Sequence, residues 1–197
     1  QICRNIQSLT ILFEMKISNG LADLISSQQN LKHLHVYCFP CESLTMNVIT
    51  SLKNLPNSLI KLELDNRGYI VVPLSFIARL TNLQEITFEF RDQGSFEGFK
   101  ELLYVTFSHL QVLRFYREIP ENERLVADNL VNLAIAKFCP NLRKLFAGFK
   151  KNELETLKMI FNSCQYLESL KTRCCSKYLN EKELFESIIK DSPKNFH

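Results

Sequence analysis

The chain has 197 residues, of which 46% are hydrophobic and 23% are charged, a composition typical of a folded globular protein. Its formal net charge of +3 is too small to indicate nucleic-acid binding by itself, and no apolar run reaches the roughly 18 residues that a membrane-spanning helix requires. Neither a signal peptide nor an Asn-x-Ser/Thr glycosylation acceptor is present, so we expect an intracellular protein, cytoplasmic or nuclear, whose cysteines are mostly reduced.

A pattern of apolar anchors recurs seven times along the chain. Each copy has a first anchor, a second three residues later and, in most copies, a third five residues after the first. The alternation has the period of a β-strand, which turns the anchors to one side of a sheet and the residues between them to the other. The first anchors are Ile6, Leu31, Leu59, Leu83, Leu110, Leu142 and Leu167.

The segments between successive first anchors are 24 to 32 residues long, which leaves room for one strand and one helix or helical turn in each. Helical periodicity is clearest at 154–161 and 184–189. Further helices are expected at about 20–28, 44–54, 73–80, 95–106 and 123–138. We therefore predict a single α/β domain over residues 1–197, a leucine-rich-repeat solenoid with about seven strand–helix coils, a parallel inner sheet and the shape of a right-handed horseshoe.

The segment from Leu110 to Leu142 is the longest, at 32 residues. It contains a polar, proline-bearing loop at 118–124, followed by a run at 125–138 that is long enough for a full helix. We interpret it as one enlarged coil; a second interpretation is that 130–133 is the remnant of a partly deleted repeat. Because the phrase before Leu142 restarts at Ser192, we also expect both ends of the chain to be cut within the repeat pattern.

Four cysteines occupy equivalent places in the pattern. Cys3, Cys139 and Cys164 each lie three residues before a first anchor, and Cys175 lies eight residues after one. A shared place argues for a shared structural role, and a free cysteine packs as a small apolar residue. We predict that these four are buried thiols.

A second group of cysteines lies beside two histidines, in the tract His33, His35, Cys38 and Cys41. Nitrogen and sulfur ligands of this kind can bind zinc, yet no second pair of cysteines with zinc-site spacing accompanies them. The alternation predicts that both histidines point outward from the strand. We predict no metal and no cofactor, and whether this tract binds a metal is left open.

No catalytic motif is present in the chain. His109 occupies the place before a first anchor where Asn stands in four other copies, so we interpret it as a turn residue that bonds the backbone. We therefore predict no catalytic residues. A metal- or thiol-dependent enzyme that uses Cys38 or Cys41 is the alternative from a different functional class.

The residues two, four and six positions after each first anchor should form one continuous sheet face. This face has a histidine and tyrosine end, an acidic middle and a basic, aromatic end. Aromatic and arginine side chains dominate the energetics of protein interfaces, so a partner is expected on this face. The predicted partner-binding residues are His33, His35, Tyr37, Glu63, Asp65, Glu85, Glu89, Arg114, Tyr116, Lys144, Phe146, Lys171 and Arg173.

Three phrases, at 138–146, 160–170 and 192–197, carry a family resemblance. They resemble the cysteine-containing leucine-rich repeats of F-box proteins, and more closely the expanded F-box/leucine-rich-repeat family of some symbiotic soil fungi. The phrases at 82–88 and 107–113 are similar, so the resemblance extends over essentially the whole chain. It departs around 117–130, where relatives commonly carry additional repeat sequence.

The resemblance implies a role in ubiquitin ligation. In such proteins an N-terminal F-box docks on a Skp-type adaptor of a cullin ubiquitin ligase, and the repeats recruit the substrate. The F-box is not in this chain, so the adaptor would bind only through an F-box outside it. We expect a protein substrate on the continuous sheet face, which is the concave face of the horseshoe. We expect neither nucleic acid nor a membrane as a partner. The alternative is an interaction scaffold unrelated to ubiquitination.

Overall fold

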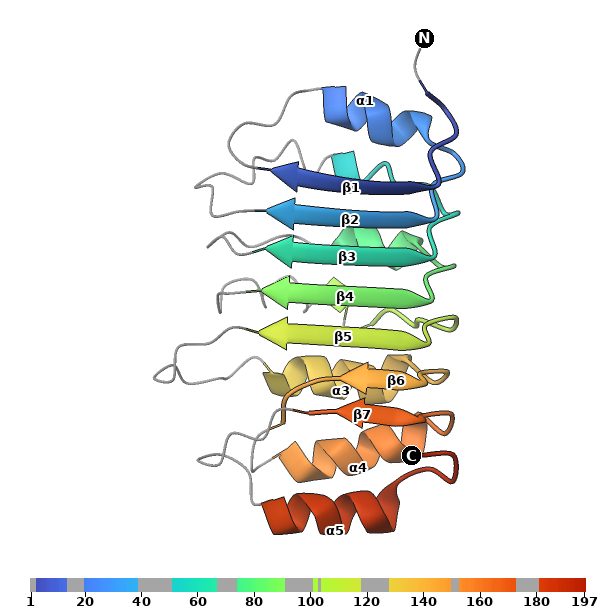
Figure 1. Cartoon of the computed structure of the whole chain (residues 1–197). Coiled ribbons are helices and arrows are strands. Elements are labelled where there is room, and N and C mark those ends of the chain that lie inside the picture. The colour runs from blue at the N-terminus through green and yellow to red at the C-terminus, as the bar shows by residue number, and fades with distance from the viewer. Residues whose placement is uncertain are drawn as a thin grey trace.

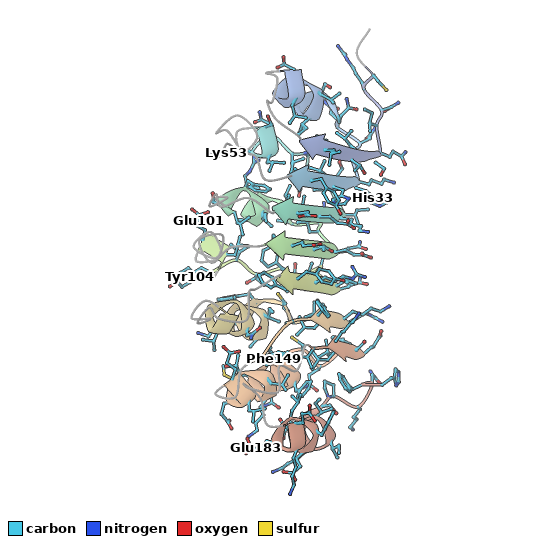
Figure 2. The ribbon with its side chains drawn as sticks, turned by 60° about the vertical axis from the view of Figure 1, so that its left-hand side comes forward. His33, Lys53, Glu101, Tyr104, Phe149 and Glu183 are labelled. Atoms are coloured by element: carbon cyan, nitrogen blue, oxygen red, sulfur yellow. The ribbon has the colours of Figure 1, made fainter. Side chains whose placement is uncertain are left out.

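The computed structural model describes residues 3–13, 20–38, 51–66, 74–90, 101–102, 104–117, 128–149, 153–172 and 181–197. These residues form a two-layer α/β structure, in which a seven-stranded sheet carries the helices on one of its faces (Figures 1 and 2). The strands stand side by side in chain order, all parallel, and the sheet is open. They are β1 Ser8–Phe13, β2 His33–Cys38, β3 Lys61–Asn66, β4 Glu85–Phe90, β5 Val112–Arg117, β6 Lys144–Phe146 and β7 Ser169–Lys171.

The strands begin where the anchor pattern predicts. Each starts two residues after its first anchor, and residues at the same place in successive copies pair across the sheet. One such row runs through Ser8, His33, Lys61, Glu85, Val112, Lys144 and Ser169. The predicted parallel sheet is therefore confirmed, and equivalent positions of the anchor pattern are found in register.

A line of backbone hydrogen bonds lies just before the strands. The N–H group of the residue after each first anchor donates to the carbonyl of the corresponding residue one strand earlier, as from Lys32 to Gln7 at 2.9 Å. The same bond joins His197 to Glu168 at 2.9 Å, beyond β7. These bonds align the first residues of adjacent strands, regardless of the length of the segment that connects one strand to the next.

Polar side chains join the turns that precede the strands. The Asn30 amide donates to Oδ1 of Asn5 at 2.9 Å, and the Asn141 amide donates to the carbonyl of Ser108 at 2.7 Å. Nδ1 of His109 lies 3.0 Å from the carbonyl oxygen of Thr81 in the same arrangement. The prediction that His109 is a turn residue bonded to the backbone is confirmed.

The anchors form the core between the sheet and the helices. The first anchors from Leu31 to Leu167 are at most 1% exposed, whereas Ile6, which precedes β1, is half-buried. The second anchors Leu9 and Leu170 are also half-buried, because β1 and β7 each have a neighbouring strand on one side alone. Burial is thus deepest in the middle of the sheet.

Helical elements occupy the predicted places at 20–28, 73–80, 123–138, 154–161 and 184–189, although not always in the predicted form. Most residues of the regions predicted at 44–54 and 95–106 lie outside the described residues. The region expected at 73–80 contains a short 3₁₀ helix, and two apolar residues of the last helix, Phe185 and Ile189, are 56% and 82% exposed. None of the described helices combines the length and the apolar character needed to cross a bilayer. The described helices are α1 Gly20–Ser27, η1 Ser75–Arg79, α3 Asp128–Phe138, α4 Leu154–Ser163 and α5 Glu181–Asp191.

The longest segment contains one helix and no additional strand among its described residues. Residues 130–133 lie inside α3, and β5 pairs directly with β6. Residues 130–133 therefore form no strand, which favours one enlarged coil over the remnant of a partly deleted repeat. The polar loop at 118–124 lies outside the described residues. Within α3, the buried Asn132 amide donates to the carbonyl of Gly148 at 3.1 Å and to Oε2 of Glu153 at 3.2 Å, which ties α3 to the start of α4.

Two of the four predicted structural thiols are buried. The Cys164 thiol donates to the carbonyl of Cys139 at 3.2 Å, so the cysteine place of one copy bonds that of the preceding copy. Burial raises the pKa of Cys164 to about 12, and burial together with the neighbouring Cys164 raises the pKa of Cys139 even further. Cys3 is exposed, so its predicted burial is wrong: it precedes β1, where the described chain has no earlier strand to receive it. Cys175 lies outside the described residues.

Candidate functional site: the open face of the sheet

The sheet presents one face without helices, built from the residues between the anchors. Figure 2 shows His33 on this side, and Lys53, Glu101, Tyr104 and Glu183 on the helix side. The face residues of adjacent strands lie in register, about 4.8 Å apart. We call this surface the strand face; it comprises residues 8, 10 and 12 of β1 and the corresponding residues of β2 to β7.

Charge on the strand face is separated along the sheet. On β3 and β4 the face positions carry four carboxylates (Glu63, Asp65, Glu85 and Glu89) against one lysine, a formal net charge of −3. On β5 to β7 they carry three cations (Arg114, Lys144 and Lys171) and no carboxylate, a formal net charge of +3. Regions of opposite charge are therefore adjacent on the sheet, which favours a partner with the complementary arrangement of charges. Arg173, predicted at the basic end, lies outside the described residues.

A hollow of about 350 Å³ opens on the acidic part of the face. Thr87 is one of its lining residues, a short side chain whose row neighbours Glu63 and Arg114 are both long. The missing side-chain volume at Thr87 leaves the depression between them. The hollow is lined by His35, Tyr37, Lys61, Glu63, Leu64, Asp65, Thr87, Glu89, Arg114 and Tyr116.

Ion pairs hold several of the charged side chains in place. Glu63 contacts the Lys61 ammonium of its own strand, and its Oε2 lies 3.5 Å from Nδ1 of His35 on β2. Nη1 of Arg114 lies 3.4 Å from Oε2 of Glu85 on the neighbouring strand. Partly exposed pairs of this kind add little to stability. Their effect here is to orient the charges that surround the hollow.

Two aromatic pairs lie on either side of the hollow. The His35 and Tyr37 rings have centroids 4.5 Å apart, as do the Tyr116 and Phe146 rings. The Lys171 ammonium lies 5.3 Å from the centroid of Phe146. Tyr37 and Tyr116 are half-buried and line the hollow, so each offers part of its ring to a ligand.

Two predicted face residues are buried rather than exposed. Phe146 is 8% exposed because Tyr116 and Lys171 cover its ring, so the prediction of an exposed aromatic anchor at this position is wrong. Asp65 is 3% exposed, although its backbone lies at the predicted face position and its side chain lines the hollow. For Phe146, the side chains of neighbouring strands decide the burial.

The metal and thiol alternatives involve only some residues of the described part of the chain. No group of three or more His, Cys, Asp and Glu residues in that part is arranged to hold a metal ion. The structure describes only part of the candidate zinc tract formed by His33, His35, Cys38 and Cys41. Cys41 lies outside the described residues, and His35 contacts Glu63 and Tyr37. The buried thiols of Cys139 and Cys164 have raised pKa values, which disfavour the thiolate needed for nucleophilic attack.

One feature of the site and one of the helix side were not predicted from the sequence. The hollow beside Thr87 was not predicted, although the small size of Thr87 between Glu63 and Arg114 was a readable signal. The buried Asn132–Glu153 contact had no such signal, because its two residues belong to different segments.

Comparison with models of known protein families, with curated proteins and with solved structures finds no match. A functional proposal for this chain therefore has to start from the strand face itself.

Proposed function

We propose that the chain is a leucine-rich-repeat solenoid, a right-handed horseshoe that binds a protein partner across the strand face. We further propose that it is the substrate-recognition region of an F-box subunit of a cullin ubiquitin ligase. The anchor spacing and the resemblance of the cysteine-containing phrases support the family. The strand face supports the binding role.

The observation that carries the binding role is the separation of charge across an in-register face. Residues of four successive strands surround the hollow, with the −3 and +3 regions beside one another. A surface needed only for solubility has no reason to sort its charges by strand, whereas a partner uses such sorting to set its orientation. Partly exposed aromatic rings beside the charges supply the contacts that typically dominate binding energy.

The test is a charge-swapped variant that keeps the protein folded. Exchanging Glu85→Arg with Arg114→Glu keeps the ion pair but inverts its polarity, so we expect stability within about 0.5 kcal/mol of wild type. Affinity capture followed by quantitative mass spectrometry should then show a partner bound by wild type and lost with the swap. The matched control is Glu181→Arg on α5, which is exposed on the helix side and should retain that partner. If every captured protein survives the swap, the strand face is not the binding surface.

The ligase role is tested separately, with the full-length protein. A Skp-type adaptor should be recovered together with it, and that recovery should be unaffected by the Glu85/Arg114 swap because the adaptor binds elsewhere. A partner lost with the swap but no adaptor recovered would leave an interaction scaffold unrelated to ubiquitination.

A further inference from the structure

The strand face also indicates the chemistry of the segment that binds it. We infer that it recognises an extended protein segment carrying one basic and one acidic side chain, the basic one in the hollow and the acidic one over β6 and β7. This inference rests on the proposed function, because it needs a protein partner on the strand face. It goes further by stating which two side chains that partner must present.

The basic side chain is indicated by one row of the sheet. Tyr37, Asp65, Glu89 and Tyr116 are in register on β2 to β5. Of the two carboxylates between the tyrosines, Asp65 is 3% exposed, so the half-buried Glu89 is the one that a ligand can contact. With Glu63 they give the hollow three carboxylates against the two cations Lys61 and Arg114. Carboxylates accept charge-assisted hydrogen bonds from guanidinium or ammonium groups, and tyrosine rings attract cations over their faces. The hollow is open to solvent on its outer side and large enough to take one long side chain.

The acidic side chain is indicated by two lysines on the neighbouring strands. Lys144 on β6 and Lys171 on β7 are both exposed on the strand face. Lys171 pairs with Phe146, which lies two residues after Lys144 on β6, so the two lysines are diagonal neighbours on adjacent strands. The Phe146 ring below Lys171 holds this ammonium group above the sheet. A carboxylate lying between the two lysines would meet no carboxylate at the face positions of β5 to β7.

The distance between the hollow and the two lysines sets the spacing between the basic and the acidic side chain of the partner. Glu89 on β4 and Lys171 on β7 are three strands apart, which is about 14 Å across the sheet. An extended chain advances by about 3.4 Å per residue, so about four residues cover that distance. The basic and acidic side chains of the bound segment should therefore lie about four positions apart.

The probes are nine-residue peptides that differ only in two positions of a Gly-Ser background. The mixed peptide is acetyl-Gly-Ser-Arg-Gly-Ser-Gly-Glu-Ser-Gly-amide. Its relatives have Arg at both positions, Glu at both positions, or citrulline and Gln, which keep the shapes without the charges. Binding to the 197-residue chain is followed by NMR titration at low salt, where exposed ion pairs are strongest.

We expect the mixed peptide to bind about fivefold more tightly than each of the other three, because each solvated ion pair changes affinity by about twofold to fivefold. Its shifts should map to β3, β4, β6 and β7. A nonspecific charge effect would instead rank the peptides by net charge and favour Arg/Arg or Glu/Glu. Such a ranking would overturn the inference, as would the absence of measurable binding of the mixed peptide up to about 10 mM.

Two variants test whether the basic side chain of the peptide binds in the hollow and the acidic one at the lysines of β6 and β7. Glu89→Gln should weaken the mixed peptide but leave a citrulline/Glu peptide unchanged, and Lys171→Gln should weaken the mixed peptide but leave an Arg/Gln peptide unchanged. The matched controls are Glu181→Gln and Lys190→Gln on α5, which should change none of these affinities. If neither strand-face variant has an effect, the inference fails. The proposed function would still stand if a captured partner is lost with the Glu85/Arg114 swap, so the two failures are distinguishable.

Discussion

Two regions of the sheet differ in the length of their strands. In the long-strand half, residues 8–117, five strands have six residues each; in the short-strand half, residues 144–197, the two strands have three. The difference follows the third anchor, which is Ile, Val, Leu or Phe in the long-strand half but Ala147 and Thr172 in the short-strand half. A large third anchor buries the second part of its strand against the core, whereas a small or polar one gives that part little to hold it to the sheet.

In the short-strand half β6 ends at Phe146, and the Ala147 N–H group makes one more hydrogen bond to the sheet, to the carbonyl of Lys171 at 3.1 Å. Ala147 and Phe149 are buried, and the carbonyl of Gly148 accepts a hydrogen bond from Asn132 of α3. Helix α3, which precedes this half in the chain, packs against α4 within it. Strand length is thus set by local side-chain size, and helix packing takes over where the strand is short.

The largest expected effect comes from removing a third anchor in the long-strand half. Phe115 is 8% exposed and its ring lies 6.1 Å from that of Phe88, so Phe115→Ala should lower the free energy of unfolding by about 3–5 kcal/mol. Urea denaturation measures the loss, and hydrogen exchange should show faster exchange from residue 115 onward in β5 than before it. The control Leu12→Ala, at a position 51% exposed, should change stability by less than about 0.5 kcal/mol. Uniform acceleration along β5 would contradict the anchoring role.

An intermediate effect is expected when the short-strand half is taken to alkaline pH. The folded pKa of Cys164, about 12, and the raised pKa of Cys139 lie above the roughly 8.5 of an unfolded thiol, so the folded state keeps protons that the unfolded state releases. Their stabilisation is complete below about pH 8.5 and is lost as pH rises toward 12, with a slope of up to about 1.4 kcal/mol per pH unit for each thiol.

Urea midpoints measured in steps from about pH 8 to pH 10.5 follow this loss. The slope should be smaller in a Cys139→Ala/Cys164→Ala variant than in wild type. Hydrogen exchange at the alkaline end should show β6, β7 and α4 opening before the long-strand half. Equal slopes in the two proteins would mean that other groups govern the alkaline loss.

The smallest expected effect is a gain of stability at the third anchor of β7. The Oγ1 atom of Thr172 is buried and has no hydrogen-bond partner within the described ranges. Thr172→Val removes this hydroxyl at nearly constant shape, so the free energy of unfolding should rise by about 1 kcal/mol. A matched Thr87→Val, half-buried on the strand face, should give no gain in the same urea experiment. A loss at position 172 would show that the hydroxyl is satisfied.

The backbone of the sheet was predictable from the sequence because anchors are local. Alternation around Leu34 or Leu62 predicts both the strand and the direction of its side chains, and equal spacing from the first anchor predicts the register. The burial of Phe146 was not predictable in this way. It depends on Tyr116 and Lys171, which come from two other strands and cover the ring after the sheet has formed.

The helix side was predictable in place more than in form. Periodicity indicated a helix at 184–189, but it does not say which element is available to cover an apolar face, and Phe185 and Ile189 are exposed. Cys3 was misassigned for the same reason: its place in the pattern matches that of Cys139, but the described chain has no strand before β1 to bury it. The sequence pattern therefore predicts which way a side chain points, whereas its burial depends on the elements that lie next to it.

The line of backbone bonds before the strands has one further consequence. Segments of 24 and of 32 residues end at the same bond, between the residue after one first anchor and the corresponding residue after the next. Insertions and deletions on the helix side are therefore absorbed before the chain re-enters the sheet. A reporter sequence or an affinity tag placed in such a segment should leave the spacing of the side chains on the strand face unaltered, so the binding surface and the outer layer can be engineered independently.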